Sequence, residues 1–281
     1  MFGRSLSIFA VALLTATTSV TSLASTASSA RLRDPEVFHA GYFPDLLDEL
    51  SYDPDVRIAL GRAGLETLSR QRSVRGFTAE KNLRSPGGLV ALVAREGFEA
   101  GMDPRYLVRL AQRESNFDPF AGAQTSTAFG LFQFTENTWL CSLKEFGPAL
   151  GVSGAEAIWR NRRGVCETST RGERARLLAL RSDASLSTKV AAAFSLKNYR
   201  VLSSEFGRRP SASELYMLHF FGQDAGLRFL EGYALRPYLP ASLLVPDAAA
   251  SNGRIFFTSG GRPRTVGEVF DRLRLAGLGR L

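Results

Sequence analysis

The sequence contains few residues that could bind a metal ion. Its 281 residues include two cysteines, Cys141 and Cys166, and two histidines, His39 and His219, which lie far apart in the chain. Structural zinc sites need four cysteine or histidine ligands at short, regular spacings, and no such spacing is present. The sequence therefore predicts no metal site and indicates no cofactor.

Acidic residues are fewer than basic ones, 27 against 35, which gives a net charge of +8. A basic protein can bind nucleic acid, but the charges are scattered, as in RLRD and RNRRG, without a long basic run or a DNA-binding motif. We therefore expect no nucleic-acid partner. Another anionic polymer and an ordinary solvated surface both remain open as explanations of the charge.

The sequence lacks an apolar stretch of membrane-spanning length, and its N-terminus has a different character. A basic start at Met1–Arg4 precedes an apolar run over 6–16, which is too short to span a bilayer. A Ser/Thr/Ala tract follows, with possible cleavage after Ala24 or Ala30. This order is typical of a secretory signal peptide, which we place at residues 1–30. An uncleaved anchor is the alternative, and no cysteine follows that could carry a lipid.

Two cysteines in an exported protein favour a disulfide bond, because the compartments outside the cytosol are oxidising. We therefore predict a bond between Cys141 and Cys166. Two free thiols are the alternative.

The most informative stretch runs from Arg113 to Trp139, RESNFDPFAGAQTSTAFGLFQFTENTW. Before it, Asp103-Pro104 predicts the start of a helix. One face of this helix carries Leu107, Leu110, Ala111 and Glu114. A carboxyl group on a face that should be apolar is a candidate proton donor. A solvated carboxylate at the edge of the face is the alternative.

The segment after Glu114 is rich in hydrogen-bonding groups. Gly122–Gly130 consists mostly of small and hydroxyl residues, a composition typical of a loop. Gln133 then places one amide among apolar neighbours, and Thr135 can cap a further helix that carries Trp139. A proton donor, a polar loop, an amide and nearby aromatic residues would suit a polyol or amino-sugar substrate.

The motifs ES-x-F-D-P, G-L-F-Q-F and T-x-x-T-W, in this order, resemble the catalytic core of the soluble lytic transglycosylases of bacterial cell walls. The resemblance implies an all-α, lysozyme-like domain in which Glu114 is the single catalytic acid/base. It also implies that Gln133 contacts the sugar and that a loop hydroxyl, Thr125 or Ser126, lies near the scissile bond. Phe132, beside Gln133, is a further candidate contact.

Two downstream residues are candidates for the same site. Asn198 shares a helix face with Phe194 and is either a structural hydrogen-bonding residue or a sugar contact. His219 follows a capping box and is either a core residue or a substrate contact. In the family a tyrosine followed by Asn-x-Gly lies near the acid, and the matching run here is His219-Phe220-Phe221-Gly222. The L-Y-x-x-H-F-x-G pattern is similar to that of a subgroup, and we favour a substrate contact for His219.

The chain divides into four predicted segments. These are the signal peptide at 1–30, a helical lead-in at 31–84, the lysozyme-like domain at 85–245 and a C-terminal extension at 246–281 that packs on the domain. Within the domain we expect an irregular insertion at 147–186 with a helix near 173–180. A Pro/Ala-rich linker is expected around Pro246, and Thr265 should cap a last helix.

The resemblance implies a periplasmic lyase that cleaves the β-1,4 bond between N-acetylmuramic acid and N-acetylglucosamine in peptidoglycan, leaving a 1,6-anhydro sugar and using no cofactor. Two alternatives remain open: a hydrolytic muramidase or chitinase, and a non-catalytic wall-binding protein of the same fold. The sequence predicts no oligomeric state.

Overall fold

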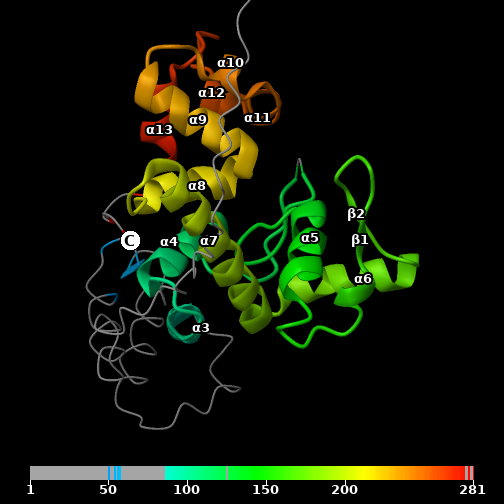
Figure 1. Ribbon diagram of the computed structural model, residues 1–281. Coiled ribbons are helices and arrows are strands. Elements are labelled where there is room, and N and C mark those ends of the chain that lie inside the picture. Colours follow the sequence, from blue (N-terminus) through cyan, green and yellow to red (C-terminus); the bar gives the residue numbers. More distant parts are fainter. Residues whose placement is uncertain are drawn as a thin grey trace, which may run out of the picture. The chain divides into compact units, whose positions relative to one another are not determined.

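The structure of this chain is a computed structural model (Figure 1). It describes Leu50, Pro54, Val56, Arg57, residues 86–124 and 126–275, Leu278 and Leu281. The predicted signal peptide, 1–30, and most of the predicted lead-in, 31–84, lie outside the described residues.

The described part is mostly helical, which confirms the prediction of an all-α fold. The longer helices are α3 (Pro86–Glu99), α4 (Pro104–Ser115), α5 (Glu136–Phe146), α6 (Arg171–Ala179), α7 (Ala184–Phe206), α8 (Ala212–Phe221), α9 (Gln223–Leu235) and α13 (Val266–Leu273). The shorter elements are η1 (Ala155–Ala157), η2 (Leu180–Ser182), α10 (Ala241–Leu244), α11 (Pro246–Ser251) and α12 (Gly253–Phe256). Strands β1 (Trp159–Arg160) and β2 (Cys166–Glu167) form an antiparallel hairpin.

Helix α4 begins where the sequence predicts. The Asp103 carboxylate accepts a hydrogen bond from the Arg105 amide, and Pro104 occupies the first turn. At the other end Asn116 and Phe117 both have positive φ angles, 52° and 61°. The chain therefore turns sharply within three residues of Glu114, which leaves this residue in the last turn of the helix.

The core is built around α7, which packs against α3, α5 and α8 (Figure 1). Apolar faces of these helices are fully buried, as at Val93, Leu143 and Leu202. Trp139 of α5 is also fully buried, and its indole N–H donates to the Leu177 carbonyl at 2.8 Å. This bond ties α5 to α6 and satisfies the only polar atom of a side chain that is otherwise apolar.

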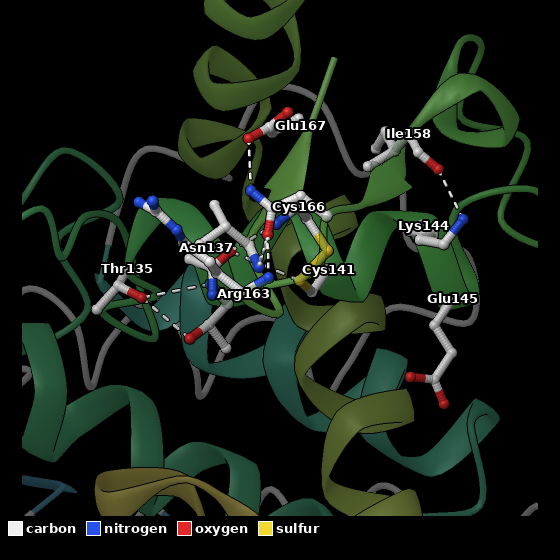
Figure 2. The surroundings of a disulfide bond; sticks show 12 residues. Thr135, Asn137, Cys141, Lys144, Glu145, Ile158, Arg163, Cys166 and Glu167 are labelled. Atoms are coloured by element: carbon white, nitrogen blue, oxygen red, sulfur yellow. Dashed lines mark hydrogen bonds between the residues drawn. A yellow bond between two sulfur atoms is a disulfide. The ribbon is translucent and has the colours of Figure 1, made fainter.

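The predicted insertion at 147–186 contains η1, the hairpin, α6 and η2. Cys141 of α5 and Cys166 of β2 form a disulfide bond (Figure 2), as the sequence predicts. The Asn137 side chain reinforces the connection, because its oxygen accepts from the Cys166 amide at 2.9 Å. The hairpin is therefore held to α5 both covalently and by hydrogen bonding.

The linker predicted around Pro246 is wrong, because short helices occupy this region. Pro246 is the first residue of α11, and Ala249 and Phe256 are buried. Thr265 caps α13 as predicted, and its capping box with Glu268 is complete. Helix α13 in turn contacts α8 and α9. Within the described ranges, no helix combines the length and apolarity needed to cross a membrane.

Candidate active site

Glu114, in the last turn of α4, is joined to α8 by a hydrogen bond. The Tyr216 hydroxyl donates to Oε1 of Glu114 at 2.8 Å. The Glu114 side chain is 15 % exposed, so solvent or a ligand can reach it. Burial raises the pKa of Tyr216 well above its ordinary value, and the nearby Glu114 carboxylate raises it further. Tyr216 therefore remains a hydroxyl donor over the whole range of pH at which enzymes work.

His219 lies one turn after Tyr216 on the same helix and stacks on its ring, with 5.9 Å between centroids. Its Nε2 is 4.0 Å from Oε1 of Glu114, beyond hydrogen-bonding distance. Burial lowers the pKa of His219, against the opposing effects of Glu114 and the Phe132 backbone. The imidazole is therefore neutral at pH 7, and it borders Glu114 without holding it in an ion pair.

Gln133 helps to fold the loop that runs past Glu114. Its backbone has a positive φ of 48°, and its amide nitrogen donates to the carbonyls of Ala121 and Gly130 at 2.9 and 3.0 Å. The amide oxygen is the end of Gln133 that could meet a sugar. The Ser115 hydroxyl, next to Glu114, donates to the Leu131 carbonyl at 3.0 Å and fixes the loop against α4.

Arg181 lies in η2, directly after α6, and holds the loop that contains Gln133 by hydrogen bonds. Its guanidinium donates to the Thr127 and Phe134 carbonyls at 2.7 and 3.1 Å and lies over the Phe129 ring at 5.2 Å. Burial lowers the pKa of Arg181, although an arginine stays charged at neutral pH. Gly130 is required here, because a Cβ at this position would lie 2.5 Å from the Arg181 carbonyl oxygen.

The other predicted loop contacts have different positions. Ser126 is exposed, and its hydroxyl accepts from the Ala128 amide at 3.2 Å. Thr125 lies outside the described residues. The Phe132 side chain is 1 % exposed and belongs to the core, so burial argues against a direct contact between this ring and a substrate.

A cleft of about 400 Å³ opens between α5, the β1–β2 hairpin, α7 and the start of α9. Asn198, from α7, lines it although the residue is only 1 % exposed. Its amide nitrogen has no hydrogen-bond partner within the described part of the chain. A buried amide donor normally has one, so this nitrogen could bind an acceptor oxygen of a ligand in the cleft.

Aromatic rings connect this cleft to Glu114. Phe194 lines the cleft, and its ring centroid is 6.4 Å from that of His219. His219 in turn lies beside Glu114. Phe194 and His219 therefore link the cleft wall to the carboxyl group through successive contacts.

Asp118 is the acidic residue nearest to Glu114 in the sequence. Asp118, one turn beyond Glu114, is exposed and accepts from the Phe120 amide at 2.8 Å, which is a turn-forming contact. Among the residues that the structure describes, no cluster of histidine, cysteine, aspartate or glutamate could hold a metal ion.

Tyr216, Arg181 and Arg113 are functional candidates that the sequence reasoning did not find. The Tyr216 signal was present in the L-Y-x-x-H-F-x-G pattern, since residues three apart share a helix face. The hydrogen-bonding tyrosine thus lies one turn before His219, the residue that the family pattern matches with its tyrosine. Arg113 contacts the Tyr216 ring, with the guanidinium carbon 4.7 Å from the centroid, and no sequence signal distinguished it from other arginines.

Residues 92–150 match the model of a family described as "Transglycosylase SLT domain". They include most of α3, all of α4 with Glu114, the loop with Gln133, and α5. The match confirms the resemblance to the soluble lytic transglycosylases over the stretch that carries its motifs, and it ends before Tyr216 and His219.

Proposed function

We propose that this chain, which carries a Transglycosylase SLT domain match over residues 92–150, is a peptidoglycan lytic transglycosylase with Glu114 as its acid and base. The observation that supports this most is the position of Glu114. A partly exposed carboxyl group receives a hydrogen bond from Tyr216 and lies beside a neutral His219. The match of residues 92–150 to the Transglycosylase SLT domain supports the substrate class.

The proposed reaction needs one carboxyl group in two roles. Protonated Glu114 donates its proton to the glycosidic oxygen as the bond from that oxygen to C1 of N-acetylmuramic acid breaks. The resulting carboxylate accepts the proton of the C6 hydroxyl, whose oxygen bonds to C1. The products are a 1,6-anhydro sugar and a chain end with a free hydroxyl, and Glu114 regains its proton. No water is consumed.

A hydrolytic mechanism with two carboxyl groups has less support. Retaining and inverting glycosidases place a second carboxyl group across the scissile bond. Asp118 is the nearest candidate in sequence, but it is occupied by a turn contact with the Phe120 amide. Tyr216 and His219, which border Glu114, are not carboxylates.

We further propose that the cleft lined by Phe194 and Asn198 receives part of the glycan strand. Its unpartnered Asn198 amide would donate to a sugar hydroxyl or an N-acetyl oxygen. The amide oxygen of Gln133 and the exposed hydroxyl of Ser126 would offer further contacts from the loop, as would Thr125. This assignment agrees with the basic net charge of +8, since anionic polymers are attracted to basic surfaces.

The substrate class places the enzyme outside the cytoplasm, and we propose export to the periplasm by the signal peptide at residues 1–30. The lysozyme-like domain would then extend over residues 85–245, with 246–281 packed against it. The contacts of α13 with α8 and α9 are consistent with such an extension.

Mass spectrometry of purified peptidoglycan digested by the exported protein tests the proposal. A lytic transglycosylase releases muropeptides that end in anhydro-muramic acid and are lighter by one water than hydrolytic products. Hydrated products instead would assign a muramidase. Absence of release from a folded preparation would indicate a wall-binding protein.

A further inference from the structure

Arg113 connects three elements around the proposed acid. It precedes Glu114 on α4, and its guanidinium lies over the Tyr216 ring of α8 at 4.7 Å. The same guanidinium donates to the Arg272 carbonyl at 3.1 Å and, more weakly, to the Arg274 carbonyl at 3.5 Å. An exposed side chain of α4 thus contacts residues that lie 159 and 161 positions later in the chain.

The carbonyls that receive Arg113 are suited to a cation. They belong to the last turn of α13 and to the residue just after it, where unpaired carbonyl groups and the helix dipole give a partial negative charge. The same end of α13 is fixed to α8. The Leu275 amide donates to the Ser213 hydroxyl at 3.1 Å, and Ser213 lies three residues before Tyr216.

We propose that Arg113 is a positioning residue for the catalytic acid, and that it transmits the position of the C-terminal helix α13 to Glu114 through Tyr216. The inference rests on the proposed function, because Glu114 must be the acid for its placement to matter. The proposal assigns a role to α13 and the residues that follow it, which lie far outside the family match at residues 92–150.

The physical basis is the orientation of the Tyr216 ring. Its hydroxyl donates to Glu114 at 2.8 Å, and cations and aromatic groups that pack on a ring limit how far the ring can shift. His219 supplies one such contact and Arg113 another. Without Arg113 the ring loses one of its packing contacts, so it can shift within its site and the hydrogen bond that orients Glu114 is populated less.

The first test is a double-mutant cycle measured as turnover on peptidoglycan. We expect Arg113→Ala to lower turnover by about 10- to 100-fold, the loss that a small misplacement of a catalytic group causes. In a Tyr216→Phe background the same substitution should add little, because the effects of residues that act through one contact are not additive.

Arg113→Lys keeps the cation without the planar fork and should restore part of the turnover. Arg200→Ala, an exposed arginine of α7, is the matched control and should match wild type.

The second test does not depend on activity. The protein is labelled with 3-fluorotyrosine, and the ¹⁹F resonance that disappears in Tyr216→Phe is assigned to Tyr216. Glu114→Gln should shift this resonance in the wild-type background, because the hydroxyl then faces an amide. In an Arg113→Ala background the same substitution should shift it less. The Arg200→Ala background should behave as wild type.

The two tests separate the inference from the function on which it rests. If wild type releases no anhydro products, the proposed function fails, and the fluorine measurement still decides whether Arg113 positions Tyr216. An equal Glu114→Gln shift with and without Arg113 would overturn the positioning role. Full additivity of Arg113→Ala and Tyr216→Phe in an active enzyme would overturn it as well, because Arg113 would then act independently of Tyr216.

Discussion

The hydroxyl of Tyr216 donates a hydrogen bond to Oε1 of Glu114 at 2.8 Å, although the two residues are 102 positions apart in the chain. The bond joins the last turn of α4 to the middle of α8. A hydroxyl at this distance stabilises the carboxylate and fixes the direction in which the carboxyl group points. In the proposed reaction the carboxylate forms when the glycosidic oxygen takes the proton, so Tyr216 would favour this step.

We predict that Tyr216→Phe lowers turnover and leaves the fold intact. A hydrogen bond to a charged group contributes about 1.5–3 kcal/mol, which corresponds to a loss of roughly 10- to 100-fold in rate. The measurement is muropeptide release under saturating substrate, with circular dichroism to verify folding. Tyr238→Phe is the control, because Tyr238 is 70 % exposed. Wild-type turnover in Tyr216→Phe would remove Tyr216 from the mechanism.

His219 should matter to activity through its position beside Glu114. We predict that His219→Phe lowers turnover, while His219→Tyr keeps part of it because a hydroxyl restores a polar group. Comparison of turnover and melting temperature for both variants decides the matter. Equal activity in His219→Phe would assign His219 to the core alone.

The same residue should also make stability depend on pH. Burial lowers the pKa of His219 in the folded protein below its ordinary value of 6.5, so the unfolded chain binds a proton more readily. The contribution of neutral His219 to the free energy of unfolding is fully present above the unfolded-state pKa. It is lost as the pH falls through the folded-state pKa. His219→Phe should remove this loss. Denaturant unfolding of wild type and variant at pH 8 and at several lower values measures it, and parallel curves would contradict the prediction.

Arg181 should be needed for the loop that carries Gln133. We predict that Arg181→Ala destabilises the protein by about 1.5–3 kcal/mol, because hydrogen bonds from a charged donor are lost. The affected carbonyls are those of Thr127 and Phe134. Hydrogen exchange should rise within residues 122–134 and remain unchanged in α3. Arg171→Ala, at an exposed position of α6, is the control. Unchanged exchange in the loop would show that Arg181 does not hold it.

The disulfide should stabilise the protein more than it supports chemistry. The bond closes a loop with a sequence separation of 25, and the chain-entropy model gives roughly 3–4 kcal/mol for such a loop. We predict that the Cys141→Ser/Cys166→Ser double variant unfolds at lower denaturant concentration and keeps turnover at temperatures where it stays folded. Thiol titration of denatured, unreduced protein should find no free thiol. Two free thiols in exported material would contradict the bond.

Local sequence signals were sufficient for the helices that surround the site. The caps at Asp103 and Thr135 and the capping box of Ser211 with Glu214 all occur where side-chain chemistry predicts them. These signals work because a cap is satisfied by residues two or three positions away.

The short helices α10 to α12 could not be predicted in the same way. Each has four to six residues, too few to show a helical period or to be stable alone. Packing supports them instead, as the full burial of Phe256 indicates. A Pro/Ala-rich composition is equally compatible with a linker, which explains the incorrect prediction at Pro246.

The site was predictable only in part, for a related reason. Glu114 became a candidate because it interrupts an apolar helix face, and the resemblance of the motifs around it implies that it is the acid/base. Tyr216 and His219 share a face of α8, and only the tertiary structure determines which of them reaches Glu114 with a hydrogen bond. Arg181 belongs to an arginine-rich segment in which burial, not sequence, distinguishes it from its neighbours.

The most direct test of the central claim compares wild type with Glu114→Gln on the same peptidoglycan, with products identified by mass spectrometry. The amide keeps the shape of the side chain but cannot donate and accept the proton, so we predict a folded protein that releases no anhydro-muropeptides. Asp118→Asn should release them as wild type does. Release of anhydro-muropeptides by Glu114→Gln at the wild-type rate would contradict the assignment of Glu114 as the catalytic acid and base.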